Sequence, residues 1–185
     1  MKRIILFSTI TLLLAVAAQG QKYFTKSGKI NFDATSANSP EKIEGVNRTV
    51  ICVVDTKTGN IQFSALLKGF EFERALMQEH FNENYVESDK FPKAEFKGTI
   101  VNNNSVNYSA DGAYDVKVEG KLTMHGETKD VLSGGKLIIQ NGKINAAAGF
   151  KILLADFKVA IPGLVADKVS NTASINVSCL LEPLK

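Results

Sequence analysis

The chain has few of the residues on which small catalytic and metal-binding sites usually depend. Its 185 residues include two cysteines, two histidines and no tryptophan. Two cysteines are too few for a disulfide-rich scaffold or a cysteine-rich zinc module. The sequence also lacks a Gly-x-Ser-x-Gly elbow, a His-Glu-x-x-His helix, a glycine-rich phosphate loop and a Cys-x-x-Cys pair. It therefore carries no signature of hydrolase, metalloprotease, nucleotide-binding or dithiol redox chemistry.

The chain also lacks an excess of charge of one sign. It has 22 basic and 19 acidic residues, and Lys2 and Arg3 lie in a terminal segment that we expect to be removed. The near-neutral remainder has no electrostatic footprint for nucleic acid and no strong attraction to an anionic membrane surface. The hydrophobic fraction of 44% and charged fraction of 22% are those of a globular protein. The length fits one domain.

Residues 1–20 predict a secretory signal peptide, which leaves residues 21–185 as a single domain. A basic start, a short apolar run at Ile4–Ala18 and small residues at its end have the order that signal peptides share. The run has 15 residues, fewer than the roughly 20 that a membrane-spanning helix needs. We expect cleavage after Gly20, with Ala17 as the alternative, and a periplasmic or secreted protein without stable membrane insertion.

Apolar residues recur mostly at every second position from residue 29 onward. Residues 113–124 show this most clearly, because Tyr114, Val116, Val118 and Leu122 alternate with charged or polar neighbours. Such a period predicts a strand with one buried and one solvated face. Seven further runs resemble it, at residues 30–34, 43–55, 61–68, 94–101, 131–140, 144–154 and 173–181.

Short polar links join successive runs, and they predict antiparallel neighbours. Asn141-Gly142 is the strongest hairpin signal among them. Eight antiparallel strands avoid exposed edges by closing into a barrel or packing as a sandwich, and runs longer than ten residues favour the barrel. The predicted fold is therefore all-β, an eight-stranded antiparallel lipocalin-like barrel with one short helix insertion.

Two segments depart from the strand pattern. Glu71–Asn84 places Leu76, Met77, His80 and Phe81 on one helical stripe, which predicts the helix. Residues 161–166 form an apolar loop or a second short helix. Cys52 and Cys179 lie in separate predicted strands; export permits a disulfide, and the sequence leaves both a bridge and two buried free thiols open.

The predicted barrel interior favours binding over catalysis. Gly98, Ala113, Gly120, Ala146 and Ala148 are small residues that we assign to the inward face, where they leave room inside a barrel of this size. The inward set has almost no ionisable groups, so a cavity there would be dry and suited to an apolar ligand. The alternative is a core in which large side chains fill this space.

The two histidines are the only candidates for acid–base or metal chemistry. His80 lies on the predicted helix and His125 in a tight turn, with Glu79 and Glu127 as neighbouring carboxylates. Their spacing is not diagnostic of a metal site. We expect His80 to be a half-buried helix residue and His125 to form local hydrogen bonds in its turn. No catalytic residue, metal ligand or cofactor is predicted, and a hydrolase or isomerase using either histidine is the least favoured alternative.

Several short motifs occur in the order found in one known family. Gly120–Val131 resembles the strand-turn-strand signature of the YceI-like family. Leu76–Phe81 and Ser88–Phe96 resemble its helix and the segment with the pattern yP-x-x-xF. Gly28–Phe32 and Asp55–Asn60 fit the same order. The resemblance covers most of the chain before the Asn-Gly turn.

This resemblance implies a lipocalin-like barrel with an elongated apolar pocket. Some members of the family bind a polyisoprenoid chain or another long amphiphile, many are exported bacterial proteins, and others have stress-related roles. Residues 68–74 read Lys-Gly-Phe-Glu-Phe-Glu-Arg, where the family often has an Arg-Asp pair. The contacts to a ligand headgroup, and with them the ligand's identity, therefore stay open.

The combined prediction is an exported binding protein that holds a long-chain isoprenoid or fatty lipid in its barrel. A structural, interaction or stress-related barrel with a filled core is the alternative, and a homodimer is left open. The predicted pocket lining consists of fourteen apolar or aromatic residues: Phe63, Leu67, Phe70, Phe72, Met77, Phe81, Phe96, Tyr114, Val116, Val118, Leu122, Phe150, Ile152 and Phe157.

Overall fold

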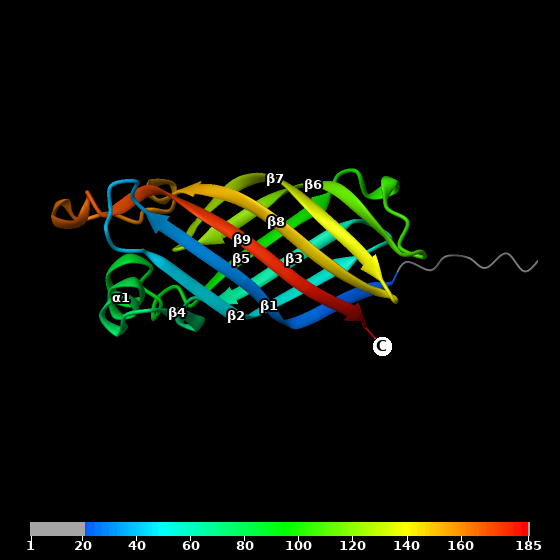
Figure 1. Cartoon of the computed structure of the whole chain (residues 1–185), viewed down its shortest axis with the longest axis horizontal. Helices are drawn as coiled ribbons and strands as arrows, with labels where there is room; N and C mark the ends of the chain where they lie inside the picture. Colours follow the sequence, from blue (N-terminus) through cyan, green and yellow to red (C-terminus); the bar gives the residue numbers. More distant parts are fainter. Residues whose placement is uncertain (1–20, 185) are drawn as a thin grey trace, which may run out of the picture.

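The computed structural model describes residues 21–184 as one strongly curved antiparallel sheet with a short helix at one end (Figure 1). The predicted signal peptide lies outside the described residues. The strands are β1 (Lys22–Thr35), β2 (Glu44–Asp55), β3 (Asn60–Leu66), β4 (Phe70–Phe72), β5 (Lys93–Ile100), β6 (Gly112–Met124), β7 (Glu127–Gln140), β8 (Lys143–Leu153) and β9 (Val169–Pro183).

Eight of these strands close into a barrel. Their order is β1-β9-β8-β7-β6-β5-β3-β2, and β2 pairs again with β1 to complete the circle. Every pairing is antiparallel, and the three-residue β4 adds to the edge of β2 near the barrel end. Closure removes the long exposed edges that an open sheet would have. The predicted eight-stranded barrel is confirmed.

β1 is longer than the five-residue run that its sequence predicted. It begins at Lys22, and its pairing with β2 shifts register between Thr25 and Gly28 and again before Ile30. Such bulges break the period of two, so the pattern did not reveal the first half of the strand. A Cβ atom on Gly28 would lie 2.6 Å from the sulfur of Cys179, so this close approach requires glycine.

The predicted helix is present but shorter than Glu71–Asn84. β4 takes up the start of that range, α1 spans Ala75–His80, and a π-helical turn, η2, spans Phe81–Tyr85. Residues 161–166 contain one 3-10 turn, η5 (Gly163–Val165). Among residues 21–184, no helix has both the length and the hydropathy needed to cross a bilayer.

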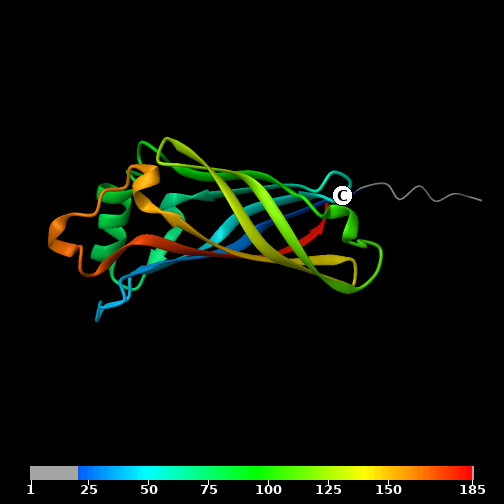
Figure 2. The same ribbon diagram turned by 90° about the horizontal axis from the view of Figure 1, so that it is seen from above.

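The two ends of the barrel differ. One end, which we call the mouth, is covered by residues 36–43, 67–92 and 154–168; it lies on the left in Figures 1 and 2, where α1 crosses it. The opposite, closed end has the tight turns between β2 and β3 and between β7 and β8. The backbone N–H of Leu184 donates to the carbonyl of Lys22 there, at 2.7 Å. The first and last strands therefore end side by side, away from the mouth.

Candidate functional site

The barrel interior holds an elongated cavity of about 160 Å³. Its wall extends along β6 from Val116 to Met124 and along β9 from Val169 to Val177. Eight residue steps at about 3.3 Å each, on strands tilted by roughly 40°, give a length of about 20 Å along the barrel axis. The cavity is therefore long and narrow, with a cross-section suited to a single extended chain.

Twelve of the fourteen residues predicted as pocket lining lie on this wall. They come from β3, β5, β6 and β8 and from the covering segment 67–92, so the fold brings together positions that are far apart in the sequence. These residues are Phe63, Leu67, Phe70, Phe72, Met77, Phe81, Phe96, Val116, Val118, Leu122, Phe150 and Ile152.

The other two predicted residues lie elsewhere. Tyr114 is half-buried at the closed end of β6, where its hydroxyl donates to the carbonyl of Asn107 at 3.4 Å. Phe157 is fully buried in the 3-10 turn after β8 and packs with the core outside the cavity wall. Both side chains belong to the packing that surrounds the cavity.

β1, β7 and β9 also contribute to the wall, and the predicted set omitted them. Their lining residues follow the period of two that marks the inward face of a strand, so the same pattern could have found them. They include Ile30, Phe32, Val131, Leu137, Ile175 and Val177.

The wall is apolar almost throughout. None of its described residues carries a charged side chain, and only Ser133 and Tyr85 carry a hydroxyl. The Ser133 hydroxyl lies 2.9 Å from the carbonyl of Gly134 and 3.0 Å from that of Gly149, so the strands themselves satisfy it. Burial raises the pKa of Tyr85 above its ordinary value. The interior can bind apolar surface but offers few hydrogen bonds to a ligand.

Small residues on neighbouring strands create the free space. Gly135, Ala146 and Ala148 all line the cavity, and Gly135 pairs with Ala148 across β7 and β8. The assignment of Ala146 and Ala148 to the inward face agrees with this arrangement. The pairing of β7 with β8 ends at Gly134 and Gly149, although both strands continue toward the mouth. The wall is less bulky where Gly135, Ala146 and Ala148 lie.

Two other small residues create no space. Gly98 and Gly120 pair across β5 and β6, and a Cβ atom on either would come within 2.7 Å of the Phe96 ring. The ring thus covers the two glycines and replaces their missing side chains. The inward assignment of Ala113 was wrong, because this residue is exposed on the outer face of β6.

An aromatic cluster closes much of the mouth. The ring of Phe81, at the start of the π-helical turn, lies 4.9 Å from the ring of Phe72, 5.5 Å from that of Phe70 and 5.9 Å from that of Phe32. Three of these rings belong to the covering segment 67–92, and Phe32 belongs to β1 of the barrel. Met77 of α1 also reaches the cavity, whereas Leu76 and His80 are exposed, contrary to the predicted stripe. The six-residue α1 is too short to bury a full stripe.

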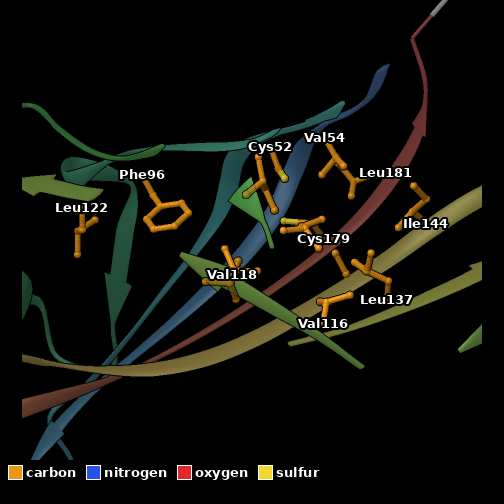
Figure 3. Close-up of a cluster of buried hydrophobic side chains, with 14 of the residues drawn as sticks. Cys52, Val54, Phe96, Val116, Val118, Leu122, Leu137, Ile144, Cys179 and Leu181 are labelled. Carbon is orange, nitrogen blue, oxygen red and sulfur yellow. The ribbon is translucent and has the colours of Figure 1, made fainter. Parts of the chain in front are cut away.

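Figure 3 shows part of the buried core, in which the wall residues Phe96, Val118 and Leu122 lie on one side of Cys52 and Cys179. Cys52 and Cys179 lie next to each other as free thiols, and Val54, Ile144 and Leu181 lie beyond them toward the closed end without solvent exposure. A hydrogen bond with Cys179, together with burial, raises the pKa of Cys52. These five residues do not line the cavity, so a ligand would enter from the mouth.

His125 connects three segments at the mouth. Its Nδ1 lies 2.8 Å from the carbonyl oxygen of Phe157, and its Nε2 lies 2.8 Å from a carboxylate oxygen of Glu87. These partners are 32 and 38 residues away, so the expected local hydrogen bonds are replaced by long-range ones. Because a carbonyl oxygen only accepts, Nδ1 donates to it. His125 therefore fastens the β6–β7 turn to two of the covering segments, residues 67–92 and 154–168.

No metal centre is evident among residues 21–184. Within that range, no group of three or more histidine, cysteine and carboxylate side chains converges as metal ligands do. His80 is exposed on α1, whereas the His125 ring is almost buried and both of its nitrogens are engaged. The two histidines do not form a common site.

Comparison with known proteins places this geometry in context. A model of the YceI-like domain matches residues 10–180. A polyisoprenoid-binding domain from Saccharophagus degradans, implicated in plant cell wall breakdown, has a similar structure, with a TM-score of 0.76 and 13% identity over 89% of this chain and 99% of that chain. BcnA from Burkholderia cenocepacia has a TM-score of 0.66 and 15% identity over 83% of this chain and 95% of that chain. No curated protein matches the chain in sequence.

Proposed function

The chain belongs to the YceI-like family, and from this premise we propose that it is an exported protein that binds one long apolar or amphiphilic lipid in its barrel. A polyisoprenoid chain is the favoured ligand class, because the similar domain from Saccharophagus degradans is described as polyisoprenoid-binding. Export rests on the signal-peptide pattern of residues 1–20. The proposed role is binding rather than catalysis.

The apolar wall is the observation that carries this proposal. The cavity is about 20 Å long, and no charged side chain lies on its described wall. It therefore favours a ligand that has no charged or hydrogen-bonding groups along its length. Burying apolar surface contributes about 25 cal/mol per Å², so a chain enclosed over its whole length can bind tightly. The cost of ordering that chain offsets much of this gain.

The mouth favours a ligand whose polar end is uncharged. Three basic side chains of the covering segment are already paired: Lys68 with Asp89 at 2.5 Å, Arg74 with Glu41, and Lys90 with Glu87 at 3.9 Å. An anionic headgroup would have to compete with these carboxylates. Tyr85 lies at the mouth and lines the cavity, so its hydroxyl is well placed to meet the polar end of a neutral amphiphile.

Native mass spectrometry of the mature chain, exported in a bacterial host, tests the proposal. We expect an added mass that organic extraction removes and that fragments as an isoprenoid or fatty chain. If extracted protein then incubated with polyprenol or a fatty alcohol stays at its apo mass, the barrel with a filled core replaces the proposal.

Two substitutions on β6 separate binding from folding. Val118→Asp places a charge on the cavity wall and should abolish uptake, whereas Ala113→Asp on the outer face of the same strand should not. Circular dichroism checks that both variants fold. Equal uptake by the two folded variants would place the ligand outside the barrel.

A further inference from the structure

An uncharged loop extends beyond the mouth of the barrel. Residues 159–166 read Val-Ala-Ile-Pro-Gly-Leu-Val-Ala, eight residues without a charge. Figures 1 and 2 both show the segment around η5 projecting from the end of the molecule where α1 lies. Leu164, within η5, is 94% exposed. Single exposed leucines are common on protein surfaces, but a whole apolar loop at the entrance of a cavity is not.

The loop is held in a defined position. The N–H of Val159 donates to the carbonyl of Leu154 at 3.1 Å, and the N–H of Ser36 donates to the carbonyl of Lys168 at 2.9 Å. These bonds fasten both ends of the loop to the barrel. Pro162 precedes the turn, and the N–H of Val165 donates to its carbonyl at 3.0 Å. Leu164 is therefore presented to solvent by an ordered turn.

The inner and outer sides of this loop form one apolar path. Val159, at the start of the loop, and Val169, three residues after its end, line the cavity, and Ile161 packs against the core. Leu164 continues the apolar surface outward, and Leu76 on α1 is 61% exposed at the same end of the molecule. An apolar chain leaving the cavity beside this loop would meet no charged side chain of residues 159–166.

The charge of the mouth decides which surface this loop suits. Residues 36–43, 67–92 and 154–168 contain nine carboxylates and six basic side chains. Within 154–168, two acidic and two basic residues balance. Anionic lipid would therefore be repelled by the mouth as a whole, whereas an electrically neutral interface would not.

We propose that residues 159–166 dock the barrel, mouth first, on a neutral lipid–water interface by inserting Leu164. Docking brings the apolar loop into contact with the acyl region and places the cavity entrance against the membrane. It resembles the shallow insertion of interfacial anchors, which depends on buried apolar area. The docking does not depend on which ligand the cavity holds, so it can be tested on lipid-extracted protein.

The absence of tryptophan gives a direct probe. The Leu164→Trp variant carries a single tryptophan, because the natural sequence has none. With vesicles of phosphatidylcholine we expect its emission to shift to the blue and to be quenched by lipids brominated on the acyl chain. The matched control is Leu132→Trp, since Leu132 is 70% exposed on the outer wall of β7; its emission should not change.

A second pair of variants measures affinity. Leu164→Asp should weaken co-sedimentation with phosphatidylcholine vesicles by about tenfold or more, whereas Leu132→Asp should bind as the natural chain does. Added phosphatidylglycerol should weaken binding of the natural chain. Absence of vesicle binding, equal responses at Leu164 and Leu132, or binding that requires anionic lipid and is lost in high salt would each overturn the proposal. Dimerisation through Leu164 without vesicle binding, detected by light scattering, would assign the loop to a second copy of the chain instead.

Discussion

A larger side chain on the cavity wall tests whether the cavity is empty in the lipid-free barrel and whether a lipid occupies it. Ala148 lies on the inward face of β8, beside Gly135 on the less bulky side of the wall. The substitution Ala148→Leu adds three carbon atoms to the free space. If each buried carbon contributes about 0.8 kcal/mol and ordering the leucine costs about 0.5–1 kcal/mol, the lipid-free barrel should be stabilised by about 1.5 kcal/mol.

The size of the cavity allows this gain. An empty apolar cavity costs about 24 cal/mol per Å³, so 160 Å³ corresponds to roughly 4 kcal/mol by that scale. The leucine should recover part of this cost and should occupy space that a lipid chain needs. We therefore expect higher stability and weaker lipid uptake from the same substitution.

Urea unfolding of lipid-extracted protein measures the first effect, and native mass spectrometry after incubation with polyprenol measures the second. Ala113→Leu, on the exposed face of β6, is the matched control and should change neither quantity. A folded Ala148→Leu variant with unchanged stability and unchanged uptake would refute the reasoning. Such a result would mean that the space beside Ala148 is neither an empty cavity in the lipid-free barrel nor part of the ligand's binding site.

Three further predictions concern stability and reactivity. Burial and the neighbouring Tyr23 raise the pKa of Tyr108 to about 12, so the folded protein favours the neutral phenol. The resulting contribution to the free energy of unfolding is complete below pH 10 and is lost as the pH rises through 12. Because the ring is partly exposed, we expect the free energy of unfolding measured in urea titrations to fall by about 1 kcal/mol between pH 10 and pH 12. The fall should be smaller in Tyr108→Phe. His125→Ala should lower stability by about 2–3 kcal/mol in thermal unfolding, whereas His80→Ala should have no measurable effect. Equal effects would show that the long-range hydrogen bonds of His125 do not stabilise the fold. Cys52 and its partner thiol should not react with a water-soluble disulfide reagent until the barrel unfolds, and rapid reaction of native protein would show that the closed end opens.

The barrel was predictable because its strands repeat one pattern. In β6 the alternation from Tyr114 to Leu122 fixes which face is buried, and the Asn141-Gly142 turn fixes the pairing of two neighbours. The same period marks the inward residues of β7 and β9, which the predicted lining omitted. The bulges of β1 could not be predicted, because they interrupt the alternation, and the residue that packs closest to Gly28, Cys179, belongs to another strand.

The mouth was less predictable because its geometry depends on packing between distant segments. A helical stripe predicts a helix but not that β4 and a π-helical turn replace its two ends. The turn chemistry of His125 suggested local bonds, whereas its partners come from segments more than thirty residues away. Which small residues leave space was equally hidden: Ala148 faces free volume, but Gly120 lies under the ring of Phe96.

The adjacency of the first and last strands at the closed end also makes this fold a candidate for circular permutation. Lys22 and Leu184 are joined by a hydrogen bond, so a short flexible linker could connect them without crossing the barrel. New ends could then be opened at the Asn141-Gly142 turn, which lies at the same end. Such a rearranged chain would keep every covering segment intact, and a reporter domain fused at the new ends would sit opposite the mouth, where it would not obstruct the proposed uptake of lipid.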